Sequence, residues 1–381
     1  MAHSECRHAL VVASALLLTA CSARPAQISN SRTGAYEVAM TALDDGFAVA
    51  WYDRRDGNGE IYMRLVDAKG SPSGPERRLT NSAEDSYEAS IDRFGDAIAV
   101  GWYDESEQGQ QTASLGLWSR DGTRRWVHAF GSGTRNPVVR ANASGIFCAW
   151  VQAEQDGHEA VFASWWDARG QQKAAPVRLG AASKTTWNLN AALDEQGGAW
   201  VVFAAEVDTR ASEVYVAKAD KPATAIRITK DDGAPSAYPD LSIGAGDRLA
   251  LSWQDERDGN VEVYLLTGVM GDLTGEIDGR SRRVTNTPGE TIGAYLTWND
   301  DRIGLSWSDK MSGQHEVYFQ SFDRTGTPRE PARRLTNNAT WSLVPAICPD
   351  GQGFALAWNE YQPETVEVHN GSSEVFFLSV P

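Results

Sequence analysis

The sequence predicts an all-β protein, a seven-bladed β-propeller in which each blade is a four-stranded antiparallel sheet. Three observations support this prediction: a pattern that returns about every 50 residues, a high content of tryptophan and glycine (14 Trp and 35 Gly), and no segment with a sustained helical period. Repeated groups of four short strands are typical of propeller blades. We expect a single propeller domain over residues 25–381.

The repeat is clearest in the three segments that begin at Trp51, Trp253 and Trp307. In each segment an acid lies two residues after the tryptophan, and a glutamate lies nine residues after it. Apolar residues flank a turn of Asp, Gly and Asn, which is the local chemistry of a β-hairpin. Aligning the other units on the same aromatic position gives seven units with gaps of 51, 48, 53, 50, 54 and 51 residues, at Trp51, Trp102, Trp150, Phe203, Trp253, Trp307 and Trp358.

Each unit divides into four strands, A to D. In the first unit we expect them at residues 36–43, 47–53, 60–66 and 76–80. Strand D ends in the phrase Arg78-Leu79-Thr80-Asn81, and similar phrases begin at Arg227, Arg283 and Arg334. These phrases mark the outer edge of each blade.

The two ends of the chain predict how the ring closes. The seventh unit supplies strands A to C, at residues 344–348, 354–360 and 374–380, but no strand D. Gln27-Ile28-Ser29-Asn30 resembles the strand D phrase and precedes the first strand A. We therefore expect this N-terminal segment to complete the seventh blade, which leaves no long open sheet edge. An open β-solenoid is the alternative.

Two motifs carry a resemblance to a known family. The segment from Arg55 to Tyr62, followed by the phrase at Arg78, resembles the WD40-like (PD40-type) repeat of the TolB β-propeller, and Cys348-Pro349-Asp350-Gly351 resembles the Pro-Asp-Gly turn of that repeat. The resemblance implies propeller blades. The TolB propeller has six shorter blades and an extra N-terminal domain, so its partners do not transfer to this chain. Sialidase-like propellers are similar in outline, but their Asp-box motif is missing here.

Residues 1–20 are predicted to form a signal peptide. Arg7 supplies positive charge, and the apolar run at residues 9–18 is shorter than the roughly 20 residues that span a bilayer. Leu18-Thr19-Ala20-Cys21 resembles the lipobox of bacterial lipoproteins. The resemblance implies cleavage before Cys21 and acylation of this residue, with 21–24 as a short linker. An ordinary signal peptide with a chance cysteine is the alternative. We expect a lipid-anchored protein of the cell envelope, at the outer membrane.

The net charge limits the classes of partner, and the cysteine positions limit the possible disulfides. The net charge is −16, and such a surface repels nucleic acid. The expected partners are an envelope protein or a glycan, with the membrane contacted only through the lipid and the chain itself a monomer. Cys148 and Cys348 fall on blades that are not adjacent, too far apart for a disulfide. Both are expected to be buried free thiols.

The acid after the tryptophan and the glutamate that opens strand C recur together around the ring. A hairpin brings such residues to about 5 Å from each other, where two carboxylates repel unless a cation or a proton separates them. One interpretation is a set of divalent cation sites, such as calcium sites. The alternative, favoured by the number of repeats, is that Arg55, Arg257 and backbone amides neutralise the acids, and that no cofactor is bound. The four pairs are Asp53 with Glu60, Asp255 with Glu262, Asp309 with Glu316, and Glu360 with Glu374.

Aromatic residues are expected in the connections from strand D to the next strand A, on the same face of the propeller as the B–C turns. Aromatic rings among carboxylates stack on sugars or anchor peptides. The alternative is that these aromatics begin the A strands and pack between blades. The predicted ligand-binding residues are Asp53, Tyr87, Asp104, Trp187, Tyr238, Asp255, Asp309, Trp341 and Glu360, and Tyr295 belongs to the same series of aromatics.

The leading functional hypothesis is a binding scaffold for a protein or another ligand. The alternative is a glycan-acting enzyme, a sialidase-like hydrolase or a polysaccharide lyase, which requires an asymmetric carboxylate pair or a Tyr–His pair at one cleft. No Ser-His-Asp, Cys-His or metal-ligand spacing surrounds His128, His158, His315 or His369. His369 lies in the longest B–C insertion, 361–373, where a lone histidine is more often solvated than catalytic. No catalytic residue is therefore assigned.

Overall fold

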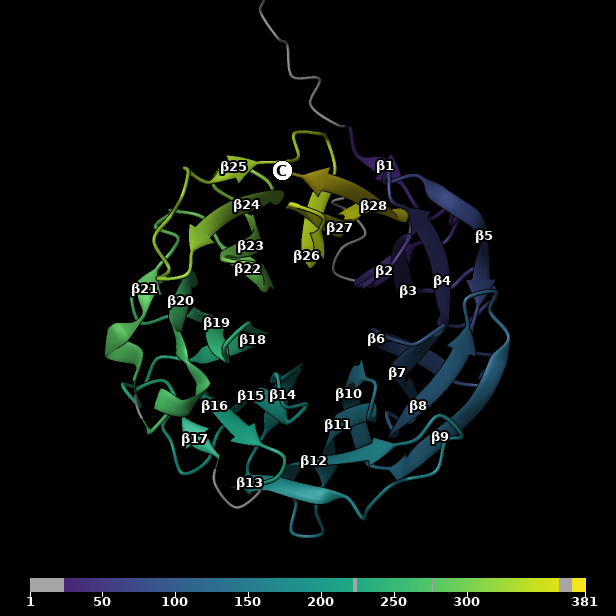
Figure 1. Ribbon diagram of the computed structural model, residues 1–381, viewed down its shortest axis with the longest axis horizontal. Helices are drawn as coiled ribbons and strands as arrows, with labels where there is room; N and C mark the ends of the chain where they lie inside the picture. Colours follow the sequence, from purple (N-terminus) through teal and green to yellow (C-terminus); the bar gives the residue numbers. More distant parts are fainter. Residues whose placement is uncertain (1–23, 222–224, 276, 363–371) are drawn as a thin grey trace, which may run out of the picture.

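The computed structural model describes residues 24–221, 225–275, 277–362 and 372–381. They form seven four-stranded antiparallel sheets arranged around a central axis (Figure 1), which confirms the predicted seven-bladed propeller. The predicted signal peptide and the lipidation site Cys21 lie outside the described residues, as does His369. No helix within the described ranges is long and apolar enough to cross a membrane.

The second and third strands of the blades contain most of the buried residues, whereas the innermost strands are more often partly exposed. The innermost strands surround the axis (Figure 1); they are β2 (Ala35–Leu43), β6 (Asp85–Phe94), β10 (Thr134–Asn142), β14 (Thr186–Leu193), β18 (Ser236–Gly244), β22 (Thr291–Asn299) and β26 (Trp341–Asp350). The second strands carry the repeating aromatic residue; they are β3 (Gly46–Asp53), β7 (Ala97–Glu105), β11 (Gly145–Ala153), β15 (Ala199–Ala205), β19 (Arg248–Asp255), β23 (Arg302–Asp309) and β27 (Gly353–Tyr361).

The third strands pair with the second strands without a break in register, whereas the fourth strands vary in length. The third strands are β4 (Glu60–Asp67), β8 (Gln111–Ser119), β12 (Glu159–Trp166), β16 (Glu213–Lys218), β20 (Glu262–Val269), β24 (Glu316–Asp323) and β28 (Ser373–Val380). The fourth strands are β5 (Pro72–Arg78), β9 (Arg124–Ser132), β13 (Val177–Ser183), β17 (Ile226–Arg227), β21 (Arg282–Arg283), β25 (Arg333–Arg334) and β1 (Ala26–Gln27). Two short 3₁₀ helices, η1 (Met270–Asp272) and η2 (Asp278–Arg280), precede β21.

Apolar burial holds the blades to one another. The described core divides into seven clusters, and each cluster joins the facing surfaces of adjacent sheets. Trp51 and Trp253 are fully buried, which explains why a large aromatic residue recurs once per blade. Cys148 and Cys348 are buried free thiols, as predicted. Burial raises the pKa of the Cys348 thiol to about 12.

The N-terminal segment closes the ring, as predicted. Strand β1 pairs antiparallel with β28, and the backbone N–H of Ile28 donates to the carbonyl of Val375 at 2.7 Å. The Ser29 hydroxyl then accepts the N–H of Val375 at 2.7 Å. In blade 1 the Thr80 hydroxyl accepts the N–H of Ile61 at 2.8 Å in the same way.

This substitution of a side chain for a backbone partner explains why β5 ends at Arg78 and not at the predicted residue 80. At Thr80 the backbone-to-backbone hydrogen bonds between β4 and β5 are replaced by a hydrogen bond from the Ile61 N–H to the Thr80 hydroxyl. The resemblance between the Gln27 phrase and the Arg78 phrase therefore reflects the same hydrogen bond.

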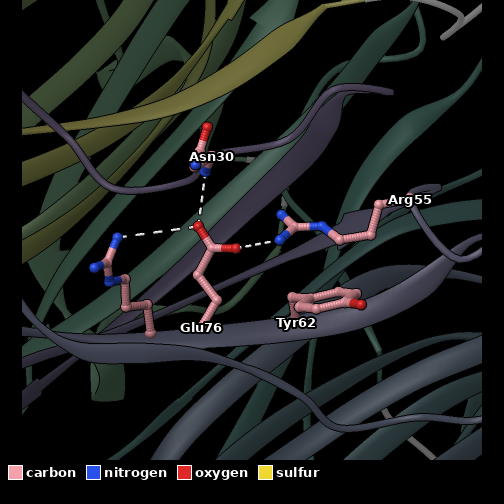
Figure 2. Close-up of a pocket in the computed structure, with 5 residues that line it drawn as sticks. Asn30, Arg55, Tyr62 and Glu76 are labelled. Atoms are coloured by element: carbon pink, nitrogen blue, oxygen red, sulfur yellow. Dashed lines mark hydrogen bonds and ion pairs between the residues drawn. The ribbon is translucent and has the colours of Figure 1, made fainter.

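A group of polar side chains secures the closure against blade 1 (Figure 2). The Glu76 carboxylate accepts the backbone N–H of Asn30 at 2.7 Å, forms an ion pair with Arg55, and lies 3.9 Å from the Arg64 guanidinium. The Arg55 guanidinium lies 4.5 Å from the centre of the Tyr62 ring. These five residues line a pocket of about 350 Å³ at the seam.

Candidate ligand-binding site at the ring centre

The recurring acids after tryptophan form an internal hydrogen-bond network. Asp53 has no exposed surface and accepts from the Trp51 indole N–H at 3.3 Å and the Arg55 backbone N–H at 2.9 Å. Asp255, which is 1% exposed, accepts from the equivalent indole of Trp253 at 2.9 Å. Burial alone would raise the pKa of Asp255, but the hydrogen bonds and charge of Arg257 outweigh burial and lower this pKa overall.

The other predicted acids make the same contacts. Asp104 accepts from the Ser86 hydroxyl at 2.6 Å, and Asp309 accepts from the Thr291 hydroxyl at 2.7 Å. Glu360 accepts from the Trp358 indole at 2.7 Å. A serine or threonine of the innermost strand donates to each of these three acids: Ser86 to Asp104, Thr291 to Asp309 and Ser342 to Glu360. Asp53 accepts instead from Ser31, which precedes β2.

The glutamates that open strand C form a second network. Glu60 accepts from Arg78 at 2.7 Å, from the Thr80 hydroxyl at 2.5 Å, and from the Ser82 backbone N–H at 3.0 Å. Glu262 and Glu316 repeat this arrangement with the arginine and threonine of their own strand D phrases.

Arginines, hydroxyls and backbone amides thus neutralise the recurring acids, even though the strand register places members of each pair opposite one another. Within the ranges that the structure describes, no group of three or more His, Cys, Asp and Glu side chains is arranged to hold a metal ion.

The predicted aromatics do not lie in the D–A connections. They belong to the innermost strands, because each connection ends within a few residues of the strand D phrase. Tyr87 packs between Tyr52 and Tyr103, at ring-centre distances of 5.0 and 5.7 Å. Tyr238, in contrast, keeps 49% of its surface exposed. The five aromatics and their strands are Tyr87 in β6, Trp187 in β14, Tyr238 in β18, Tyr295 in β22 and Trp341 in β26.

Every innermost strand contains a β-bulge near its start. At the bulge one residue adopts a left-handed backbone conformation, with φ between 47° and 63°. A β-branched residue such as Val344 rarely adopts this conformation, and each such residue costs about 1–3 kcal/mol unless the surroundings impose it. Because the bulge occurs in all seven blades, it belongs to the architecture. The bulge residues are Glu37, Glu88, Asn136, Asn188, Tyr238, Gly293 and Val344.

A pocket of about 340 Å³ opens where β18, β22 and β26 meet. Two small residues create it. Gly293 leaves a bulge position without a side chain, alone among the seven, all of which the structure describes. Ala237 stands where the other blades carry larger side chains, since the residue before the bulge is Tyr36, Tyr87, Arg135, Trp187, Ile292 or Leu343 elsewhere.

The walls of this pocket combine apolar surface with polar groups. Tyr238, Tyr295, Ile292 and Val344 supply the apolar surface. The polar lining is Gln254, Asp255, Glu256 and Glu290. Glu256 and Glu290 are exposed at the rim, whereas Asp255 is committed to the network described above.

Gln254 is the unusual member of this lining. Its side chain is 6% exposed, and its amide nitrogen has no hydrogen-bond partner among the described residues. An unpaired buried amide costs about 1–3 kcal/mol. The amide therefore gains from a ligand that supplies an acceptor.

A carboxyl pair lies on the opposite side of the axis, on blades 1 and 2. The Glu37 carboxylate accepts the backbone N–H of Glu88 at 3.2 Å, and Asn136 donates to Glu88. Burial raises the pKa of Glu37 to about 8, and the charge of Glu88 adds to this rise. Burial also raises the pKa of Glu88.

Carboxylates around the axis affect the ionisation of Tyr295 in the pocket wall. Burial raises the pKa of Tyr295 in the pocket wall, and the charges of Asp240, Glu88 and Glu37 raise it further. The Tyr295 hydroxyl is therefore within electrostatic reach of carboxylates from three other blades.

The histidines lie apart from this pair. His315, which is 3% exposed, packs its ring 5.2 Å from that of Trp341, and its Nε2 atom lies 3.8 Å from the Glu290 carboxylate at the pocket rim. Burial lowers its pKa. His158 is half-exposed beside Asp156.

Sequence reasoning missed the residues that shape this region. Glu37, Glu88 and Gln254 do not belong to any recurring motif. The available signal was the exchange of large residues for Ala237 and Gly293, which becomes visible only once the innermost strands are aligned on their bulges.

The fold and this site define a seven-bladed β-propeller with a pocket beside its axis. No protein-family model and no curated protein matches the sequence. Among solved structures, the chain is similar to a protein of unknown function from Dyadobacter fermentans, with a TM-score of 0.55 and 10% identity over 94% of this chain and 99% of that chain.

Two further structures are similar in fold. The β-propeller domain of the Trilobed protease from Pyrococcus furiosus gives a TM-score of 0.55 and 9% identity over 91% of this chain and 93% of that one. An α-L-arabinanase from Penicillium chrysogenum gives a TM-score of 0.53 and 9% identity over 76% of this chain and 92% of that chain. The Pyrococcus domain is described as an open velcro topology, whereas β1 closes the ring here. These similarities establish the fold.

Proposed function

We propose that this protein is a ligand-binding scaffold of the bacterial cell envelope, held at the outer membrane by lipid on Cys21. The observation that carries the proposal is the pocket between β18, β22 and β26, with its unpaired Gln254 amide. The lipobox-like segment supports the envelope location. An envelope protein segment or a glycan is the proposed ligand.

The binding surface differs from the one that the sequence suggested. Tyr238 is its exposed aromatic residue, and Glu256 and Glu290 are its accessible acids. Asp53, Asp255 and Asp309 support the blades beneath it through the contacts described above. Ligand contact by Tyr87, Asp104, Trp187, Trp341 and Glu360 stays a prediction.

Filling the pocket tests the proposal. Ala237→Trp places a large side chain at a position where blade 4 already carries Trp187, so the blade geometry tolerates it. Crosslinked pull-downs and melting-temperature shifts with fractionated envelope extract should detect a ligand for the unmodified protein and for the control Ala237→Ser. The Trp variant should lose both signals. Equal capture by all three proteins would reject the pocket.

The pair formed by Glu37 and Glu88 supports a second candidate, a glycan-acting enzyme. A carboxyl group that stays protonated near neutral pH is suited to act as a general acid, and the raised pKa of Glu37 has this property. The purified protein should then release reducing sugar from envelope polysaccharide, and Glu37→Gln and Glu88→Gln should each abolish release. Release that persists in both variants excludes this pair.

A further inference from the structure

We infer that the pocket between β18, β22 and β26 binds a sugar ring of a neutral glycan. This inference rests on the proposed ligand-binding function and specifies its ligand. Three features of the pocket favour such a ligand: the hydrogen-bonding capacity of its lining residues, its apolar walls and the charge at its rim.

The polar lining requires a ligand that both donates and accepts hydrogen bonds. The Gln254 amide nitrogen is a donor without a partner among the described residues. Glu256 and Glu290 present carboxylate oxygens, which only accept when ionised. A sugar hydroxyl performs both roles. A lysine or arginine side chain only donates, so it would pair with the two acids and leave Gln254 unsatisfied.

The apolar walls suit the C–H surface of a sugar ring. Tyr238 is 49% exposed and therefore has ring surface available for stacking, and Tyr295 is half-buried in the same pocket. Ile292 and Val344 complete the lining between them. The volume of about 340 Å³ is near the lower end of the range for small-molecule sites, about 300–1,000 Å³. It fits a short stretch of glycan and excludes a folded element of a partner protein.

The charge at the site selects against acidic glycans. Glu256 and Glu290 lie at the rim, and the whole chain has a net charge of −16. Carboxylate-bearing sugars would meet repulsion at both scales. A neutral glycan avoids this repulsion and does not depend on screening by salt.

Calorimetric titration of the purified protein tests the inference. The probes are neutral trisaccharides built from glucose, galactose, mannose, xylose, arabinose or N-acetylglucosamine, with trilysine as the cationic comparison. At least one trisaccharide should bind at a single site with equal affinity at low and high salt. Gln254→Ala and Tyr238→Ala should each weaken that binding about tenfold, the effect of losing one hydrogen bond or one stacking contact.

The matched control is Asn188→Ala, which changes the bulge residue of blade 4 and leaves the pocket lining intact. It should not alter the affinity. Tyr238 is exposed, so its variant keeps the test valid even if Gln254→Ala destabilises the fold.

Failure to bind any of these trisaccharides overturns the inference, as does binding that ignores both pocket variants. Salt-dependent binding of trilysine that Ala237→Trp removes would also overturn it, but would leave the proposed scaffold function standing. Loss of the extract-derived ligand signal in Ala237→Trp separates the two proposals, because that signal does not depend on the ligand being a sugar.

Discussion

Buried carboxyl groups couple the ionisation of single residues to the stability of the whole fold. Glu37, Glu213 and Asp240 have pKa values raised by burial to about 8, 7 and 6. A carboxyl group with a raised pKa binds its proton more tightly in the folded state than in the unfolded state. Its contribution is present in full below the unfolded pKa and is lost as the pH rises through the folded value.

We therefore predict that the melting temperature falls as the pH rises from about 5 to about 8, the window between the unfolded and folded carboxyl pKa values. Glu37→Gln should flatten this decline, because a neutral amide cannot lose a proton. Calorimetry across the pH series provides the measurement. The control is Glu107→Gln at an exposed position. A decline of unchanged slope in Glu37→Gln would contradict the assignment.

A single hydroxyl also carries measurable stability. Thr80 donates to Glu60 and accepts from the Ile61 N–H, and all of these groups are buried. We predict that Thr80→Val lowers the free energy of unfolding by about 2–3 kcal/mol, because a carboxylate and an amide both lose a partner.

Urea unfolding of Thr80→Val beside Thr33→Val, which changes an exposed threonine, measures this difference. If the two substitutions lower the free energy of unfolding equally, the Thr80 hydrogen bonds do not contribute to stability as predicted. Thr336→Val should reproduce the Thr80 result, because blade 6 repeats the bridge.

At the scale of elements, the seam between β1 and blade 1 is the point where the two ends of the chain meet. Glu76 joins the backbone of Asn30 to Arg55 and Arg64 with little exposure of its own side chain. The N-terminal segment is also held by its pairing with β28, by hydrogen bonds from Ser29 and Ser31 to Glu374, and by the hydrogen bond from Arg64 to the Ile28 carbonyl. Glu76 adds the link from this segment to Arg55.

We predict that Glu76→Ala destabilises the protein by about 1–3 kcal/mol, since the Asn30 amide loses its acceptor and the Arg55 guanidinium loses one of its two carboxylate partners. It should also increase aggregation on heating, because β28 becomes an edge strand when β1 separates. Unfolding curves and light scattering against the exposed-site control Glu84→Ala test both effects. Identical curves for the two variants would count against a role for the seam.

The elements were largely predictable because their determinants are local. The aromatic position, the hairpin turn and the strand D phrase each act within one blade, so repetition made them visible. The bulges were not predictable. Glu37, Asn188 and Val344 share a backbone conformation but no residue type, so the sequence does not mark it.

At the scale of the whole molecule, the closed ring was predicted and its pocket was not. The pocket depends on two small residues, Ala237 and Gly293, on neighbouring blades, and small residues are too common to stand out without an alignment of the bulges. The acids after tryptophan stand out in the sequence because they recur, and for that reason they were predicted as ligand-binding residues. Their recurrence reflects the hydrogen bonds that every blade needs.

Location is a property of the whole chain, and the proposed anchor makes it testable. We predict that the unmodified protein fractionates with membranes and that Cys21→Ser removes it from that fraction without changing the melting temperature. Cys148→Ser is the matched control, since that thiol is buried within a blade. Membrane association that survives Cys21→Ser would contradict the lipid anchor.

The position of β1 has a consequence for the proposed attachment of the ring to a membrane. Strand β1 occupies the outer edge of the seventh blade (Figure 1), away from the axis. Only residues 22–25 separate it from the proposed lipid, a reach of about 15 Å at most. The proposed anchor would hold the propeller at its outer edge. It would leave the axial pocket accessible to long polymers that run alongside the bilayer.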